Sequence, residues 1–247
     1  MTFLNLSFNR IRGKFSGKYV HMQEIGLSSN YFEGPLPPIT TKCSNINLSK
    51  NKFSGSLHSL SVVEDLSLSF LDISHNQLSG ALSNNWMHFS GLAFLNLGYN
   101  NFSGKIPTSM GNLYNLQTLI LRNNNLYGEL PSSLKHCQGL GFVDFGLNKL
   151  SGKVPSWIGE SLPQLWKGQE FEYGRNFAYL KMIDLSTNKL SGEIPIGITK
   201  LVELRGLNLS GNYFYGKVPP EIGRLNVLEC LDLSRNNFSG QCQEGVS

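Results

Sequence analysis

The sequence is poor in charge, since only 15% of its 247 residues are Asp, Glu, Lys or Arg, and the net charge is +4. The basic residues are scattered among acidic ones without a run of either sign, which argues against a nucleic-acid partner. No stretch reaches the roughly 18 to 20 uninterrupted apolar residues that span a bilayer. The chain does not open with a basic segment and an apolar stretch either, so we expect no secretory signal.

Cysteine is also scarce, with four residues. Cys43 and Cys137 fall where other segments place leucine, so we expect both thiols in the core. Cys230 and Cys242 are expected on different sides of the chain, too far apart for the roughly 4.4 to 6.8 Å separation of a disulfide. No C-x-x-C or paired-histidine spacing occurs, so the sequence predicts no metal site and no cofactor. The histidines form no local triad, and no catalytic residue is predicted.

What the sequence has instead is a phrase close to L-x-L-S-x-N, which recurs with variations in ten segments. Its final asparagines are Asn9, Asn30, Asn51, Asn76, Asn100, Asn124, Asn148, Asn188, Asn212 and Asn236. Their spacings are 21, 21, 25, 24, 24, 24, 40, 24 and 24 residues. A fixed period of about 20 to 29 residues with this spelling is the signature of a leucine-rich repeat.

The unit NLYNLQTLILRNNNLYGELP shows how one coil should fold. Leu119 and Leu121 alternate in the manner of a strand and should point inward. Asn124 then turns the chain, and its amide can both donate and accept, so stacked asparagines should satisfy backbone groups of neighbouring coils. The sequence therefore predicts an α/β solenoid, with parallel strands on a concave face and short helical or 3-10 turns on the convex face.

A longer spelling points to one class of these repeats. The segments NNFSGKIPTSMGNLYNL, NKLSGEIPIGITKLVEL and NYFYGKVPPEIGRLNVL carry S/Y-G-x-I/V-P after the asparagine. This resembles the plant-specific leucine-rich repeat of receptor kinases, receptor-like proteins and polygalacturonase inhibitors. The stretch WKGQEFEY is similar to the end of the non-repeat island of plant receptor-like proteins of the xylanase-receptor kind.

The resemblance implies a domain organisation. Residues 1–160 would form about seven coils, 161–180 an abridged island-like insert, and 181–247 three coils without a C-terminal cap. Such relatives carry a signal sequence, a cysteine-bearing cap and a membrane tether, which this sequence lacks, so we interpret the chain as a fragment or a truncated paralogue. Without caps, Phe3, Leu4 and Leu6 at one end and Leu231, Leu233 and Phe238 at the other should be partly exposed. We therefore expect poor solubility.

Ligand selectivity should lie in the outward strand positions, because packing fixes the inward ones. The candidate ligand-binding residues are Phe70, Asp72, His75, Phe94, Asn96, Tyr99, Arg122, Phe142 and Asp144. The alternative is that the phenylalanines only pack along neighbouring strands. Island-like contacts are expected from Trp166, Glu170, Phe171, Glu172 and Tyr173. The aspartates Asp72, Asp144, Asp184 and Asp232 share one column, where we expect widely separated, solvated carboxylates rather than an acid/base pair.

Five sequons occur. Asn101 and Asn237 should lie on the flank of the coil, where a glycan is easily accommodated. Asn5, Asn47 and Asn208 are less favourable, because glycans on Asn47 or Asn208 would crowd the concave face.

The resemblance implies a non-catalytic recognition module on the extracellular side of the plasma membrane, in the apoplast, acting in defence or development. Its ligand would be a peptide, a protein or an oligosaccharide, and it would recruit a co-receptor kinase through the coils from Asn188 onward. Two alternatives stay open: a secreted inhibitor of a microbial cell-wall-degrading enzyme, and a non-functional truncated product.

Overall fold

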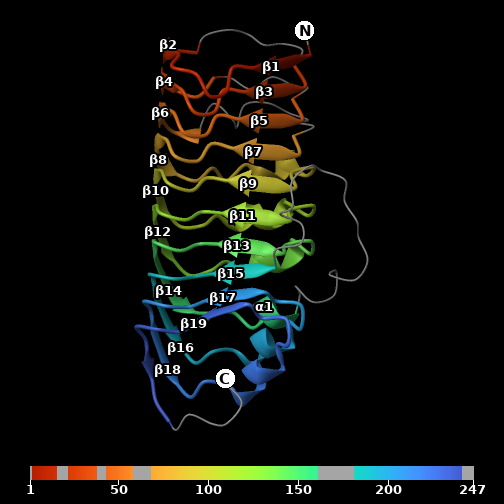
Figure 1. The fold of residues 1–247 in the computed structure, drawn as a ribbon, viewed down its shortest axis with the longest axis vertical. Helices are drawn as coiled ribbons and strands as arrows, with labels where there is room; N and C mark the ends of the chain where they lie inside the picture. Colours follow the sequence, from red (N-terminus) through yellow and green to blue (C-terminus); the bar gives the residue numbers. More distant parts are fainter. Residues whose placement is uncertain (1, 16–21, 38–42, 58–67, 161–180, 241–247) are drawn as a thin grey trace.

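The computed structural model describes residues 2–15, 22–37, 43–57, 68–160 and 181–240. Within these residues the chain winds through ten coils, and each coil gives one strand to each of two parallel sheets (Figure 1). We call them the main sheet and the flank sheet. Both keep strict chain order, since every strand pairs with those of the preceding and following coils. The predicted solenoid of parallel strands is thereby confirmed.

The main sheet contains the leucine-rich strands. They are β1 (Phe3–Asn5), β3 (Glu24–Gly26), β5 (Asn45–Asn47), β7 (Phe70–Asp72), β9 (Phe94–Asn96), β11 (Thr118–Ile120), β13 (Phe142–Asp144), β15 (Met182–Asp184), β17 (Gly206–Asn208) and β19 (Cys230–Asp232). The middle residue of each strand from β3 to β17 is buried. Leu119 in the middle of β11 is wholly buried, as is Leu121 just after this strand. Because alternate side chains of each strand point inward, the main sheet fills the interior from one side.

The flank sheet forms after the turning asparagines. Its strands are β2 (Arg12–Lys14), β4 (Tyr31–Gly34), β6 (Lys52–Gly55), β8 (Gln77–Ala81), β10 (Asn101–Gly104), β12 (Asn125–Gly128), β14 (Lys149–Lys153), β16 (Lys189–Gly192), β18 (Tyr213–Gly216) and β20 (Asn237–Phe238). Most of these strands end at a glycine with positive φ, such as Gly128 at 84°. Glycine adopts this conformation without steric cost, which explains the S/Y-G spelling.

Short helical turns complete the coils. They are the 3-10 helices η2 (Trp86–Phe89), η3 (Thr108–Asn112), η4 (Ser132–His136), η6 (Ile196–Lys200) and η7 (Pro220–Arg224), and the one-turn α1 (Trp157–Glu160). Proline directly precedes η3, η4, η6 and η7, where its fixed φ suits the start of a helix. None of the helices in the described ranges is long and apolar enough to cross a membrane.

The turning asparagines bond each coil to the one before it. Asn124 donates from Nδ2 to the carbonyl oxygens of Leu121, at 3.0 Å, and of Leu97 in the preceding coil, at 3.1 Å. Its Oδ1 accepts from the backbone N–H of Phe102, also in the preceding coil, at 2.9 Å. The same pair of inter-coil bonds recurs at every turning asparagine from Asn30 to Asn236. The buried turns are thus hydrogen-bonded along the whole stack.

The stacking continues without a break across the 40-residue spacing. Asn188 donates to the carbonyl oxygen of Phe145 at 3.0 Å and accepts from the N–H of Leu150 at 2.9 Å. Strand β13 pairs directly with β15, and β14 with β16. On the helical side, the backbones of α1 and η6 pack so closely that no side chain fits between them. A Cβ added to Gly159 in α1 would lie 2.0 Å from the carbonyl carbon of Gly197 in η6. The residues expected to form the island-like insert, 161–180, lie outside the described residues.

Both ends of the stack leave apolar side chains incompletely covered. Phe3 is 53% exposed, and Leu4 and Leu6 pack only partly against the core. At the other end Leu231, Leu233 and Phe238 are likewise only partly buried. These exposures agree with the expectation from the sequence.

The cysteines occupy the expected environments where they are described. Cys43 and Cys137 are each 1% exposed, and burial raises the pKa of the Cys137 thiol to about 12. Cys230 is exposed on β19, and these three thiols are free. Cys242 lies outside the described residues.

Candidate functional site

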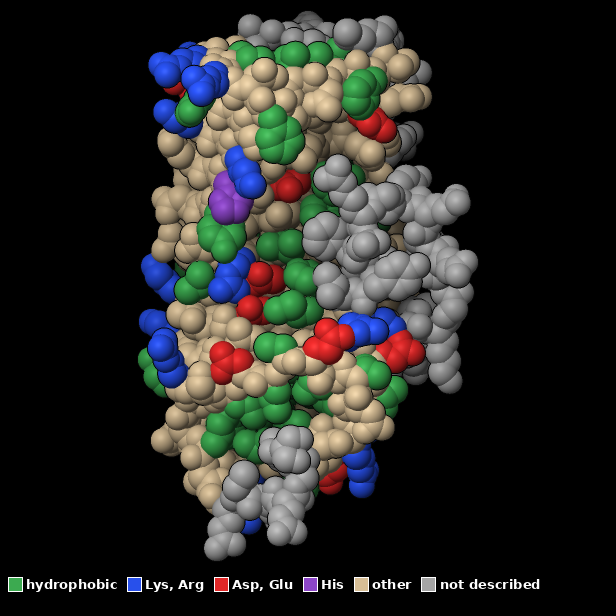
Figure 2. Space-filling view, in the orientation of Figure 1, with side chains coloured by type: hydrophobic (Ala, Val, Ile, Leu, Met, Phe, Trp, Pro, Cys, Tyr) green, Lys and Arg blue, Asp and Glu red, His purple; other side chains and the backbone are tan. Residues whose placement is uncertain are grey.

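The outward side chains of the main-sheet strands lie on one side of the molecule, which we call the main-sheet face (Figure 2). Strands pair residue for residue, so equivalent positions of successive coils line up in columns. Phe94 in β9, for example, lies between Phe70 and Thr118, and Asn96 lies between Asp72 and Ile120. Candidate residues from separate repeats are therefore direct neighbours in space.

Two aromatic pairs lie on this face, both between the coils of β7 and β9. The rings of Phe70 and Phe94 stack with centroids 4.4 Å apart and planes at 9°. Five residues later in each coil, His75 and Tyr99 stack at 4.1 Å and 9°. The phenylalanines thus pack along neighbouring strands, yet both stay half-buried rather than covered. Phe142 is also half-buried, two strands farther along at β13.

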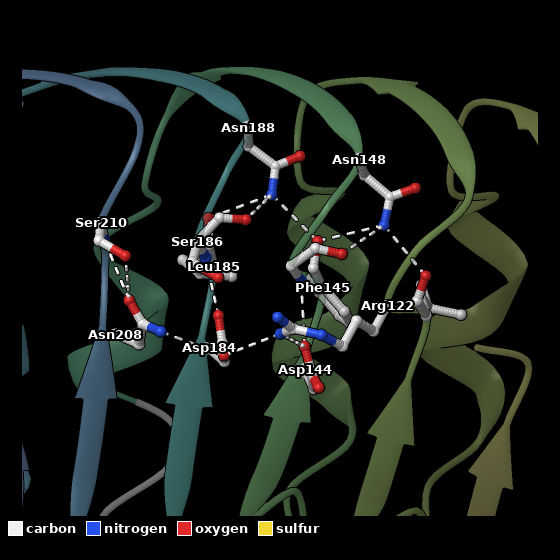
Figure 3. A network of polar contacts seen from close by, with 12 residues as sticks. Arg122, Asp144, Phe145, Asn148, Asp184, Leu185, Ser186, Asn188, Asn208 and Ser210 are labelled. Carbon is white, nitrogen blue, oxygen red and sulfur yellow. Dashed lines mark hydrogen bonds and ion pairs between the residues drawn. The ribbon is translucent and has the colours of Figure 1, made fainter. Parts of the chain in front are cut away.

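An ion-paired cluster (Figure 3) begins in the coil that follows that of Phe94 and Tyr99. Arg122 follows β11, and its Nη1 donates to Oδ1 of Asp144 at 3.1 Å and to Oδ2 of Asp184 at 2.9 Å. The arginine thereby reaches across β13 to β15. Asp184 is only 5% exposed and also accepts from the side chain of Asn208. The expectation of widely separated, solvated carboxylates was wrong for Asp144 and Asp184, because the coils before and after the long spacing are adjacent.

A glycine makes room for this arginine. In the column of Arg122 the other nine coils carry only serine or glycine. A Cβ added to Gly146, the next residue in the column, would lie 2.5 Å from Nη1 of Arg122 and 3.1 Å from Oδ1 of Asp184. The guanidinium therefore occupies the space above Gly146, and this glycine was not among the predicted residues. The signal that could have identified it is a single large residue in a column of small ones.

The acidic column also supports the turn that follows each strand. Oδ1 of Asp72 accepts from the N–H of Ser74 at 2.9 Å, and Oδ1 of Asp144 from the N–H of Gly146 at 3.1 Å. Asn96 uses its amide oxygen in the same way with Gly98. Burial raises the pKa of Asp72 and of Asp144, and Arg122 opposes the rise at Asp144. These side chains thus act in Asx-type turns as well as facing solvent.

The residues predicted to make island-like contacts cannot be placed. Trp166, Glu170, Phe171, Glu172 and Tyr173 lie outside the described residues. Among the described residues no group of three or more His, Cys, Asp or Glu could hold a metal ion.

The sequon asparagines differ in surroundings. Asn101 and Asn237 are exposed on the flank sheet, and Oδ1 of Asn101 accepts from Asn125. Asn5 is exposed at the end of β1. Asn47 and Asn208 are half-buried on the main-sheet face, where each accepts hydrogen bonds from the serine two residues later. Asn208 additionally donates to Asp184 at 3.3 Å.

Comparison with known proteins matches the same repeats. The family model described as Leucine Rich Repeat matches residues 67–89, 91–113, 115–137, 179–201, 203–225 and 227–247, more than half of the chain. Over 96 residues the chain is 40% identical to receptor-like protein EIX2 of Solanum lycopersicum, a match that covers 38% of this chain and 9% of that protein.

Solved structures resemble the fold over nearly the full chain. The ectodomain of the Arabidopsis receptor kinase HAESA, in complex with an IDA peptide hormone, matches with a TM-score of 0.77 and 29% identity, over 100% of this chain and 43% of that one. HAESA in complex with IDA and the co-receptor SERK1 matches with a TM-score of 0.66 and 27% identity, over 96% of this chain and 46% of that one. The chain thus spans less than half the length of these proteins. By its repeats, its fold and its relatives, the chain belongs to the leucine-rich-repeat family and resembles plant receptor ectodomains.

Proposed function

We propose that the chain is a non-catalytic recognition module of a plant receptor-like protein on the extracellular side of the plasma membrane. It binds an extended peptide across the main-sheet face, over β7 to β15. The observation that carries this proposal is the grouping there of two aromatic pairs and an ion-paired cluster. Aromatic residues and arginine are the usual anchors of protein interfaces.

The size of this region suits a short peptide. Four strand-to-strand steps separate β7 from β15, and at about 4.8 Å per step they span roughly 19 Å. An extended peptide covers this length with about six residues at some 3.3 Å each. Its apolar side chains would pack on Phe70, Phe94 and Phe142, and its polar groups would lie over the column of Asp72 and Asn96.

The relatives support a peptide over an oligosaccharide. The HAESA ectodomain is described in complex with a peptide hormone, and in a second structure also with a co-receptor. We infer that the coils from Asn188 onward take the co-receptor kinase, and that signalling follows from joining the two proteins around one ligand. Whether the pathway is defence or development depends on the ligand.

The test starts from a library of random peptides, each linked to the nucleic acid that encodes it. Peptides that bind the whole chain are selected from this library. Enriched peptides are then measured by calorimetry against the wild type, Phe94→Ala and the control Tyr127→Ala. Tyr127 is equally aromatic but lies 51% exposed on the flank sheet, in the coil next to that of Phe94. We expect Phe94→Ala to weaken binding by about 1 to 3 kcal/mol and Tyr127→Ala to leave it unchanged.

Equal affinity for all three proteins would place the peptide elsewhere and refute the proposed site. Failure to enrich any peptide would refute the peptide-binding function. Hydrogen exchange should also slow at the amides of β9 to β13 when an enriched peptide is bound.

A further inference from the structure

Two tyrosines project from β18 of the flank sheet, near the C-terminal end of the stack (Figure 1). Tyr213 is 62% exposed and Tyr215 is 47% exposed. Phe214 between them is wholly buried, so the alternation of the strand turns both phenol rings outward. On the preceding strand, β16, the register partner of Tyr213 is Ser191, whose side chain is too small to cover a ring. Two neighbouring aromatic rings therefore stay largely in solvent.

A sequon asparagine lies opposite this pair on the last strand of the sheet. Asn237 of β20 is the register partner of Tyr215 and is exposed on the same side of the sheet. Neighbouring strands lie about 4.8 Å apart, so the two side chains leave the backbone close together. The next residue, Phe238, points inward, and its ring stacks on that of Phe214 with centroids 6.3 Å apart. Strand β20 thus packs on β18 from the inside, while its outer residue stands beside the tyrosines.

Side chains of the flank sheet also reach past their register partners. Asn125 of β12 is paired with Ser103 of β10, yet it donates to Oδ1 of Asn101, two residues earlier, at 2.6 Å. The same offset on β20 and β18 leads from Asn237 to Tyr213. Both tyrosines are therefore outward neighbours of this asparagine.

The chain contains a second copy of the same sequon in different surroundings. The letters N-F-S-G occur at residues 101–104 and again at 237–240, each time on a flank-sheet strand. The register partner of Asn101 is Ser79, and the residue two positions before it is Gln77. At Asn237 the corresponding residues are the two tyrosines. The two sites therefore share their local sequence and differ in the side chains of the preceding strand.

We propose that Asn237 carries an N-linked glycan whose first sugar, an N-acetylglucosamine, packs on the rings of Tyr213 and Tyr215. One face of such a sugar presents C–H groups, which bury apolar ring surface while the hydroxyl groups of both partners stay in water. The glycan then joins β20 to β18 on the outside, as Phe238 does on the inside. The proposal rests on the secretion that the proposed function implies, and it does not rest on the peptide site.

A protein partner is the alternative occupant of the two rings, because exposed aromatic residues are frequent anchors of interfaces. The position of the sequon favours the glycan. A sugar on Asn237 stands in front of Tyr215, its register partner, and would block a protein from the same rings. The two occupants therefore exclude each other, and occupancy of Asn237 distinguishes them.

The test uses the whole chain secreted by a plant host, with its glycans trimmed enzymatically to the first N-acetylglucosamine. One variant combines Tyr213→Gln with Tyr215→Ser, which gives Asn237 the neighbours that Asn101 has. A second variant, Asn237→Gln, lacks the sugar. The three replaced side chains are exposed, so both variants should keep the fold.

The first measurement is the NMR shift of the acetyl methyl group of each sugar. Protons that lie over an aromatic ring resonate upfield, so we expect an upfield shift for the sugar on Asn237 and none for that on Asn101. In the tyrosine variant the shift should disappear. A sugar that merely projects into solvent gives the same resonance at both sites.

The second measurement is hydrogen exchange at the amide of Ser239, which donates to the carbonyl oxygen of Gly216 at 2.9 Å. Because the sugar holds β20 on β18, exchange should be about threefold to tenfold slower in the wild type than in Asn237→Gln. In the tyrosine variant the sugar should slow exchange by less than about twofold.

An unshifted methyl resonance at Asn237, or equal slowing with and without the tyrosines, would overturn the proposal. Folded wild type secreted with Asn237 bare would overturn it as well and leave the rings to a protein partner. None of these results bears on peptide affinity, so failure here is distinct from failure of the proposed function.

Discussion

The guanidinium of Arg122 lies in the space that any side chain at Gly146 would need, since an added Cβ would stand 2.5 Å from Nη1. The absence of a side chain on one coil therefore allows an arginine of the preceding coil to reach an aspartate of the following one. Three coils are joined by a single side chain, and Asp144 and Asp184 share its charge.

The Gly146→Ala variant should expel the guanidinium and separate Arg122 from Asp184. The half-buried carboxylate of Asp144 and the buried carboxylate of Asp184 then lose their shared cation. We therefore expect a loss of about 1 to 2 kcal/mol in the free energy of unfolding. Denaturant unfolding measures this loss. In an Arg122→Gln background the same glycine change should cost clearly less, because no ion pair remains to break.

Gly139→Ala is the matched control for this prediction. The added methyl group there would make only ordinary contacts, the nearest at 3.5 Å, and φ is not positive. It should leave stability unchanged within about 1 kcal/mol or raise it slightly. If Gly139→Ala costs as much as Gly146→Ala, the effect belongs to glycine in general and not to the arginine cluster.

Asp72 gives the fold a pH dependence that can be isolated. Burial raises the pKa of Asp72, while the hydrogen bonds of Ser74 and the charge of His75 act against the rise. The folded state therefore holds the proton more tightly than the unfolded chain. Between the ordinary Asp pKa and the raised one, this group's contribution to stability falls as the pH rises.

Asp72→Asn should abolish this contribution and keep the turn, because Asn96 already accepts the equivalent N–H in the next coil. We expect the variant to be more stable than the wild type at neutral pH, by no more than about 1 kcal/mol, with the gain vanishing in acid. Unfolding curves across the acid range measure the difference. A gain that is constant with pH would contradict the assignment to the carboxylate.

Asn124→Ala should cost about 1 to 3 kcal/mol, since it leaves the carbonyl oxygen of Leu97 and the N–H of Phe102 without their partner. Asn9→Ala is the control, because Asn9 is exposed and bonds to carbonyl oxygens of its own coil. Chemical unfolding of both variants should show a loss at Asn124 that is at least twice that at Asn9. Equal losses would mean that the inter-coil bonds contribute nothing.

Glycan occupancy should follow the surroundings of Nδ2, the atom to which a glycan attaches. At Asn101 this atom makes no hydrogen bond within the described residues and faces solvent, whereas at Asn208 it donates to Asp184. In the folded fraction secreted by a plant host, mass spectrometry should find glycans on Asn101 and Asn237 and none on Asn208. A fully occupied Asn208 in folded protein would contradict this reading of the main-sheet face.

Much of the fold was readable from the sequence, because leucine spacing fixes which side of each strand is buried. The strand and the turn of the coil that contains Leu119, Leu121 and Asn124 could be predicted from the residues of that coil alone. The relations between coils were less accessible. Asp184 looked remote from Asp144 because 40 residues separate them, and only the direct pairing of β13 with β15 makes them neighbours.

Which residues are neighbours across the flank sheet was also difficult to predict, because it depends on the register between coils. Alignment on the turning asparagines sets Arg10 opposite Tyr31, but the strand register pairs Arg12 with Tyr31. This offset of two residues is set by the backbone after each turn and has no signature in the composition. Neighbouring side chains across the flank sheet could therefore not be paired from the repeat alignment.

The unbroken bonding from Asn188 back to Phe145 and Leu150 has a consequence for how this chain can vary. Residues 160 and 181 belong to adjacent coils, so the packing of the stack does not depend on how many residues separate them. Doubling the length of such a connection adds only about 0.6 kcal/mol of closure entropy. Between these two coils, evolution or an engineer can change the number of residues while the leucine stack on either side stays the same.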